Sequence, residues 1–152
     1  MPEADQQTGY DPPGRLRQLP SWLTSQVARR AEQLVGDELA RDDMRRPHFA
    51  VLTSLAEQGA ASQAELGRRL WIDRSDLHAI LNKLEGDGLV KRVRDDSDRR
   101  RNVVALTPRG KRVLARLDAR VETAQEALLA PLSASERREL RRLLERLVAA
   151  DG

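Results

Sequence analysis

Residues 62–92, "SQAELGRRLWIDRSDLHAILNKLEGDGLVKR", decide the fold because they place two helix-start signals close together. Ser62 and Glu65 form an S-x-x-E capping box, in which each side chain accepts a hydrogen bond from the other residue's backbone N–H. Asp73 stands at the same three-residue offset from Asp76 and is the expected N-cap of a following helix. The stretch therefore predicts two short helices joined by a tight turn.

Two β-prone runs follow, "LVKRVRD" over residues 89–95 and "NVVALT" over residues 102–107. Their composition predicts the two arms of a hairpin. Between the apolar parts of these arms, residues 95–101 read "DDSDRRR", which is more ordered charge than a turn needs. Short helices followed directly by a two-stranded hairpin are typical of a winged helix-turn-helix, whose second short helix fits the major groove of DNA.

Long amphipathic helices are predicted on both sides of this unit. Apolar residues recur at helical spacing over residues 21–40. Thr107 and Pro108 are the expected N-cap and first-turn proline of a helix that Pro131 ends, and Ser133 begins a last helix through another capping box. These outer helices have more apolar face than one small lobe can cover, which favours a homodimer.

The predicted fold is therefore mainly α with a small β-hairpin. Residues 1–19 are rich in Gln, Pro, Gly and Asp without an apolar period, which predicts a flexible arm. The predicted organisation is a helical dimerisation region over residues 20–46 and 108–150 and a winged helix-turn-helix lobe over residues 47–107.

Composition excludes several classes of function. The chain of 152 residues contains no cysteine, which excludes disulfides, thiolate metal sites and cysteine nucleophiles. The sequence offers few groups for catalysis, since its two histidines are isolated and it has no glycine-rich phosphate loop. We therefore expect no catalysis, no metal and no cofactor. The N-terminus lacks a secretory pattern and no apolar run reaches the ~18 residues of a membrane span, so we expect a cytoplasmic protein.

Positive charge gathers in the middle of the chain, although the net charge is only +3. Residues 62–112 hold 13 Lys and Arg against 8 Asp and Glu. Arginine supplies 24 of the 27 basic residues, which suits phosphate and base contacts but is also typical of a GC-rich genome. The distribution of charge thus favours a nucleic-acid partner more than its total does.

Two stretches carry a resemblance to a known family. "DDSDRRRNVVALTPRG", residues 95–110, resembles the wing and following turn of MarR-type transcriptional regulators, and Asp98 and Arg100 fall on that pattern's Asp and Arg. "LNKLEGDGLVKR", residues 81–92, resembles the end of the same family's recognition helix and the start of its wing. The remaining positions of the wing pattern are matched by Leu106, Thr107 and Gly110.

The resemblance implies a homodimeric regulator, most often a repressor. It would bind a pseudo-palindromic operator in double-stranded DNA, with the recognition helix in the major groove and the wing in the minor groove. Members of such a family commonly release DNA when a small aromatic or anionic molecule binds. The residues that could line an effector site here are Trp22, Arg29, Arg30 and His48, although Trp22 at helical spacing is also typical of core.

Carried over to the wing, the resemblance makes Arg100 the minor-groove arginine and Asp98 the carboxylate that orients its guanidinium. Arg99 and Arg101 are then expected phosphate contacts, and a solvated turn face is the competing interpretation. Ser62 and Gln63, with Arg68 and Arg69, could touch the DNA backbone, or could serve only as caps and solvated groups. The expected contacts of the recognition helix are Arg74, Ser75, Asp76, His78, Ala79 and Lys83, with capping as an alternative role for Asp76.

Two other functions stay open from the sequence. A winged helix can mediate protein contacts, but that function predicts an apolar exposed recognition helix, whereas this one carries a polar series. An architectural protein that binds any duplex would discriminate little between an operator and random DNA at equal salt.

Overall fold

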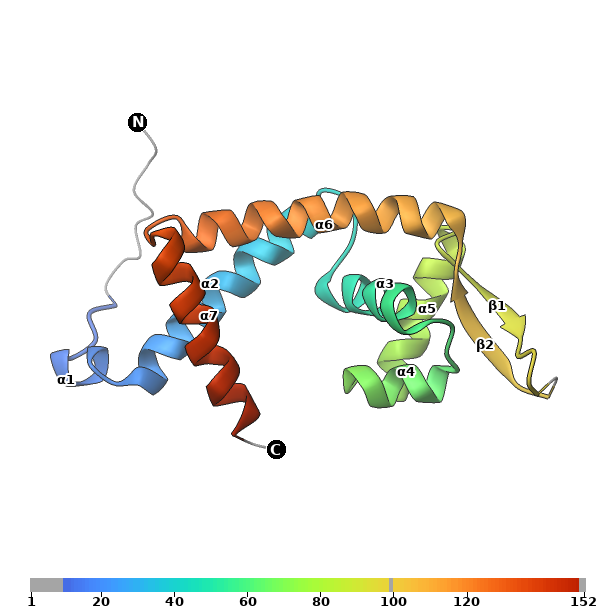
Figure 1. Cartoon of the computed structure of the whole chain (residues 1–152), viewed down its shortest axis with the longest axis horizontal. Helices are drawn as coiled ribbons and strands as arrows, with labels where there is room; N and C mark the ends of the chain where they lie inside the picture. Colours follow the sequence, from blue (N-terminus) through green and yellow to red (C-terminus); the bar gives the residue numbers. More distant parts are fainter. Residues whose placement is uncertain (1–9, 99, 151–152) are drawn as a thin grey trace.

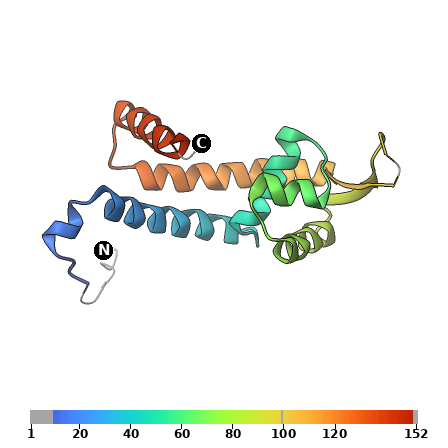
Figure 2. The ribbon, with the colours of Figure 1, turned by 90° about the horizontal axis from the view of Figure 1, so that it is seen from below.

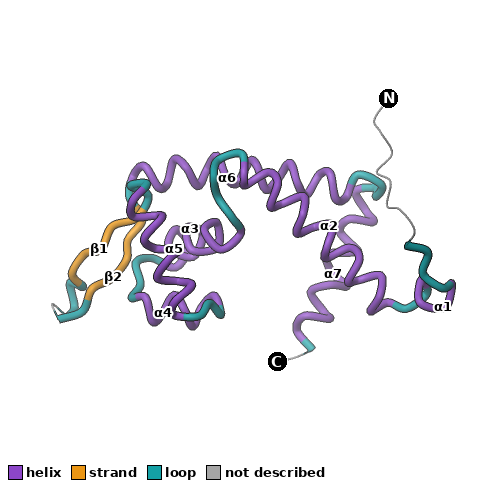
Figure 3. The backbone as a smooth tube through the Cα atoms, turned by 180° about the vertical axis from the view of Figure 1, so that it is seen from behind, coloured by secondary structure: helices purple, strands orange, loops and turns teal. Residues whose placement is uncertain are grey.

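The computed structural model describes residues 10–98 and 100–150, and shows an elongated molecule with a lobe at one end and a helical arm at the other (Figure 1). The hairpin projects from the outer side of the lobe (Figure 3). The elements in chain order are α1 (Gly14–Arg17), α2 (Pro20–Ala40), α3 (Arg46–Gln58), α4 (Gln63–Leu70), α5 (Arg74–Gly86), β1 (Val90–Arg94), β2 (Asn102–Leu106), α6 (Pro108–Leu129) and α7 (Ala134–Ala149).

The two short helices begin at the predicted caps. Ser62 Oγ accepts the backbone N–H of Glu65 at 3.2 Å, and Glu65 Oε2 accepts the N–H of Ser62 at 3.1 Å. Asp73 caps α5 by accepting the N–H of Ser75. The apolar side of α5 then enters the lobe core through Leu77, Ile80, Leu81 and Leu84.

The hairpin is joined to the helices through its inner strand. β1 and β2 pair antiparallel, with Val90 opposite Leu106 and Arg94 opposite Asn102. Ala61, just before α4, adds an antiparallel bridge to Val104 of β2. Its N–H donates to the Val104 carbonyl at 3.1 Å, and the Val104 N–H donates back at 2.7 Å. The hairpin and the two helices are therefore connected through backbone hydrogen bonds.

The arm consists of α2 and α6, which run antiparallel side by side (Figures 1 and 2). Asp42, in the turn after α2, accepts hydrogen bonds from Arg116 Nε at 2.9 Å and Arg120 Nε at 3.0 Å. The Arg120 hydrogen bond lowers the pKa of Asp42 below its ordinary 3.8, helped by the charge of Arg116 and opposed by burial. The turn that enters the lobe is thus fastened to α6.

Apolar side chains remain exposed on α7 and on α2. Helix α7 buries none of its residues, and Leu147 and Val148 are 66% and 77% exposed. On α2, Leu23 and Val27 are also about half exposed, at 47% and 50%. The apolar excess expected from the sequence is therefore present in the single chain.

Two details differ from the sequence prediction. α3 begins at Arg46, one residue before the predicted opener Pro47, because Arg45 already takes the extended N-cap conformation. The short helix α1 lies within residues 1–19, the segment predicted to be flexible. Arg17 supports it by donating to the Pro12 carbonyl at 2.8 Å and pairing with Asp11.

His48 is buried at the start of α3, with 2% of its surface exposed. Its Nδ1 accepts the backbone N–H of Arg45 at 2.9 Å, so the imidazole closes a capping box. Burial, followed by the charges of Arg45 and Lys83, lowers the pKa of His48 below its ordinary 6.5. The folded protein therefore keeps His48 neutral, as an acceptor requires.

This burial predicts a pH dependence of stability. As pH falls through about 6.5, the unfolded chain binds a proton at His48 more readily than the folded chain does, so the free energy of unfolding should fall as pH drops below about 7. In His48→Gln, which keeps an acceptor without titrating, chemical denaturation should show a smaller fall. His78→Gln, at the exposed histidine, should retain the wild-type fall; an equally steep loss in His48→Gln would contradict the assignment.

Candidate nucleic-acid interface

One face of the lobe presents α4, the start of α5 and the wing. An open groove of about 1090 Å³ lies between α4 and the start of α5. Gln63 crosses it, with its side-chain amide 3.5 Å from the Arg74 carbonyl. Further lining residues include Gly67, Arg68, Ser75 and His78. Several predicted DNA contacts are thus brought together on a single hollowed surface.

The outward side of α5 carries the predicted contacts. Arg74, Ser75, Asp76, His78 and Ala79 are all exposed, whereas the apolar residues between them are buried. The capping bonds at the start of this helix go to the Asp73 carboxylate, and the Asp76 side chain is exposed. The hydrogen bond from Ser75 lowers the pKa of Asp73, so the cap is ionised at neutral pH.

Lys83, the last predicted contact of α5, has intramolecular partners. Its ammonium donates to Asp43 at 2.9 Å and to Asp87 at 3.1 Å. The hydrogen bonds that Lys83 donates to Asp43 and Asp87 raise the pKa of Lys83. A phosphate contact would have to compete with both carboxylates, so in this structure Lys83 fastens α5 to the turn after α2.

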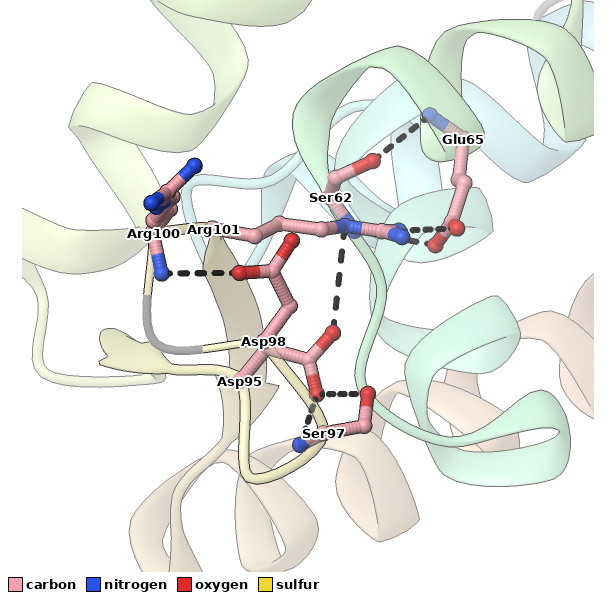
Figure 4. A network of polar contacts seen from close by, with 7 residues as sticks. All are labelled: Ser62, Glu65, Asp95, Ser97, Asp98, Arg100 and Arg101. Atoms are coloured by element: carbon pink, nitrogen blue, oxygen red, sulfur yellow. Dashed lines mark hydrogen bonds and ion pairs between the residues drawn. The ribbon is translucent and has the colours of Figure 1, made fainter.

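The wing tip is ordered by its own polar contacts (Figure 4). Asp95 accepts the N–H and hydroxyl of Ser97, at 3.0 and 2.9 Å. The Arg101 guanidinium reaches back to Glu65 at the start of α4, and lies 3.9 Å from Asp95. The Arg101 hydrogen bond, followed by that from the Ser62 N–H, lowers the pKa of Glu65, so the carboxylate stays charged.

Of the three wing arginines, the structure gives each a different place. Arg101 pairs with Glu65, so a phosphate contact would have to compete with that carboxylate, and Arg99 lies outside the described residues. Arg100 is exposed at the tip. Asp98 does bond Arg100, but through the backbone: Asp98 Oδ1 accepts the Arg100 N–H at 3.0 Å (Figure 4). The carboxylate thus shapes the turn that presents Arg100 instead of holding its guanidinium.

The predicted effector residues do not converge within one chain. Trp22 is half-buried near the start of α2, Arg29 and Arg30 are exposed farther along it, and His48 is buried as a helix cap. Because α2 rises about 1.5 Å per residue, Trp22 lies roughly 27 Å from the end of the helix that leads to His48. His48 therefore has a structural role that the sequence interpretation missed.

Within residues 10–98 and 100–150, no three acidic or histidine side chains come together as a metal-binding group. No helix in the same described ranges has the length and apolar character to span a membrane.

Two features of this face were not predicted from the sequence. Trp71, to which the sequence assigned no role, is 95% exposed in the turn between α4 and α5. The tether between Glu65 and Arg101 was equally unforeseen, because nothing local in the sequence pairs them.

Comparison with known proteins agrees with this geometry. A model described as the MarR family matches residues 42–101. The HTH-type transcriptional repressor Rv2887 of Mycobacterium tuberculosis is 36% identical over 101 residues, which are 66% of this chain and 73% of the repressor. The chain belongs to the MarR family.

Solved MarR-family structures extend the similarity to nearly the whole chain. A probable transcriptional regulator from Pseudomonas aeruginosa has a TM-score of 0.74 at 31% identity, covering 88% of this chain and 99% of its own. A mutant MarR of Escherichia coli in complex with operator DNA has a TM-score of 0.71 at 26% identity, covering 84% and 91%. PcaV of Streptomyces coelicolor with its natural ligand has a TM-score of 0.72 at 29% identity, covering 95% and 99%.

These findings make the chain a DNA-binding transcriptional regulator of the MarR family with a winged helix-turn-helix fold. The predicted family and fold class are confirmed. The roles of individual residues in DNA binding stay predictions.

The tether between Arg101 and Glu65 predicts that Glu65→Gln loosens the wing without unfolding the lobe. Glutamine keeps the capping acceptor for the Ser62 N–H but removes the charge that holds Arg101. Hydrogen exchange of the Asp95 and Arg101 amides, which close the tip, should become severalfold faster.

Glu136→Gln is the matched control, because it alters the equivalent capping box of α7 far from the wing. It should leave exchange in the wing unchanged. Equal exchange at the wing tip in wild type and Glu65→Gln would show that the ion pair does not order it.

Proposed function

We propose that this MarR-family regulator is a cytoplasmic homodimer that represses transcription by binding a pseudo-palindromic operator. The observation that carries the proposal is the joined surface of the lobe: the exposed polar side of α5 beside a wing that presents Arg100, linked by the Ala61–Val104 bridge. α5 enters the major groove, and Arg100 enters the minor groove, where the potential is most negative over A·T-rich steps.

The E. coli MarR complex with operator DNA supports this use of the surface, since the two chains share the fold at 26% identity. The polar series on α5 argues against a protein-docking winged helix, which needs an apolar exposed helix. Gln63 and Ser62 lie at the N-terminus of α4, where backbone N–H groups favour a phosphate.

The uncovered apolar side chains of α2 and α7 support the proposed homodimer. Leu143, Leu144, Leu147 and Val148 line one side of α7 without a cover from the described part of this chain. A second copy would bury these residues against its own arm and place two lobes on one face of a duplex. Half-sites would then lie about 10 bp apart, one helical turn.

We also propose that a small aromatic or anionic molecule releases the DNA. The proposal is supported by analogy with PcaV, whose structure was solved in complex with its natural ligand. Trp22, Arg29 and Arg30 on α2 offer an indole and two guanidinium groups to a carboxylate. Thiol oxidation is not an available signal, because the chain has no cysteine.

The test of the proposed function is fluorescence anisotropy with the DNA upstream of the protein's own gene and a shuffled duplex, over a salt series. Binding about a thousandfold tighter to the former would support a sequence-specific regulator. Equal, steeply salt-dependent binding would mean an architectural protein, and no binding to either would favour protein docking.

The wing assignment predicts that Arg100→Ala weakens specific DNA binding by about 1 to 3 kcal/mol. The thermal unfolding midpoint should not change, because the side chain is exposed. Arg112→Ala is the matched control: it removes an exposed arginine of α6 outside the interface and should leave the affinity nearly unchanged. Wild-type affinity in a stably folded Arg100→Ala protein would remove Arg100 from the interface.

The dimer assignment predicts that Leu147→Glu yields a monomer in light scattering at concentrations where the wild type is a dimer. The exposed position makes this substitution cheap for the isolated fold, so the helical circular dichroism should persist. Arg138→Glu, nine residues away and therefore on the opposite side of α7, should remain dimeric. A dimeric Leu147→Glu protein would place the interface elsewhere.

A further inference from the structure

Trp71 occupies a backbone position that suits glycine. It ends α4 with φ 54° and ψ 43°, in the left-handed region. That region is costly for a bulky side chain, whereas glycine adopts it without a steric penalty. The turn itself is made by the backbone, since the N–H groups of Trp71 and Ile72 both donate to the Gly67 carbonyl.

The Trp71 side chain does not pack into the fold. Trp71 is 95% exposed, the highest value among the exposed large apolar residues of the described chain. An indole in water and a strained backbone are two unfavourable features at one position, and glycine would remove both. Residues kept in strained conformations cluster at functional sites, so the indole needs an explanation outside the folded chain.

The surroundings of Trp71 indicate what the indole contacts. The next residue, Ile72, lines the groove between α4 and α5. Arg68, Arg69 and Arg74 are exposed on the two helices that the turn joins. The nearby Asp73 carboxylate is engaged by Ser75 as the cap of α5. The indole therefore stands at the edge of the surface proposed to face DNA, among cations that suit a polyanion.

We propose that Trp71 is a DNA-contacting residue that packs its ring against the sugar–phosphate backbone beside the groove entered by α5, with its Nε1–H donating to a phosphate oxygen. This inference rests on the proposed function. Indole is a donor only and is apolar elsewhere, which matches a phosphate oxygen next to the apolar side of a deoxyribose. A contact to the backbone positions the protein and carries no sequence information.

Trp71→Gly and Trp71→Phe test the proposal. Trp71→Gly should weaken binding roughly tenfold to both the specific and the shuffled duplex, because a contact to the backbone is common to both. Its thermal midpoint should match or exceed that of the wild type, because glycine adopts the left-handed backbone conformation without steric strain. Trp71→Phe, which keeps a ring but lacks the N–H, should fall between the two in affinity.

Tryptophan emission supplies a second readout at the residue itself. The chain has two tryptophans, so Trp71→Phe reports Trp22 alone and the difference from wild type reports Trp71. Adding DNA to the wild type should shift this difference signal to shorter wavelength and protect it from acrylamide, with no such change in Trp71→Phe.

The outcomes separate the inference from the proposed function. Full affinity in Trp71→Gly, or an unprotected Trp71 signal while anisotropy reports bound DNA, would overturn the inference and leave the proposed function standing. A large drop in the thermal midpoint of Trp71→Gly would give Trp71 a structural role and also overturn it. Wild-type protein that binds no duplex would overturn the proposed function and this inference together.

Discussion

The pair of backbone hydrogen bonds between Ala61 and Val104 is the constraint on which the proposed DNA-binding surface depends. It attaches the inner strand of the wing to the residue that precedes α4, so the wing cannot swing independently of the helices. The ion pair of Arg101 with Glu65 repeats this attachment farther out, from the wing tip to the first turn of α4. The proposed entry of α5 and the wing into two different grooves would benefit from this fixed relation, because both contacts would then be made without a further ordering cost.

A second joint connects this surface to the arm. Two neighbouring aspartates in the turn after α2 face opposite ways: Asp42 bonds Arg116 and Arg120 of α6, and Asp43 bonds Lys83 of α5. The orientation of α5 is therefore linked, through five charged side chains and one turn, to the helices proposed to form the dimer. In a dimer on DNA, the spacing of the two recognition helices would be set through this joint. Any ligand that moved α2 against α6 would act on the same contacts.

The sequence predicted those parts of the structure that local chemistry determines. The capping box at Ser62, the cap at Asp73, the helical period of α2 and the β-prone arms of the wing each depend on residues a few positions apart, and all appear in the structure. The exposed polar side of α5 followed from the helical spacing of its apolar residues. These signals were sufficient for the fold class and the family.

What the sequence did not predict depends on contacts between distant residues. Arg101 and Glu65 are 36 positions apart, and Lys83 and Asp43 are 40 apart, so neither pairing has a local signal. In both pairs, a residue predicted to contact DNA has an intramolecular partner. The burial of His48 was not predicted because it depends on packing, although its position as the third residue of α3 was a local hint of capping. The left-handed backbone of Trp71 was hidden because a tryptophan gives no sign of it.

The central claim is that two lobes, each a helix and a wing fixed together, bind one face of a duplex. Hydroxyl-radical footprinting of the wild-type protein on its specific DNA tests this claim most directly. The account predicts two equivalent stretches of protected deoxyriboses about 10 bp apart on one face of the duplex, each with further protection on its outer side where the wing enters the minor groove. A single protected region, or protection spread evenly along the duplex, would contradict it.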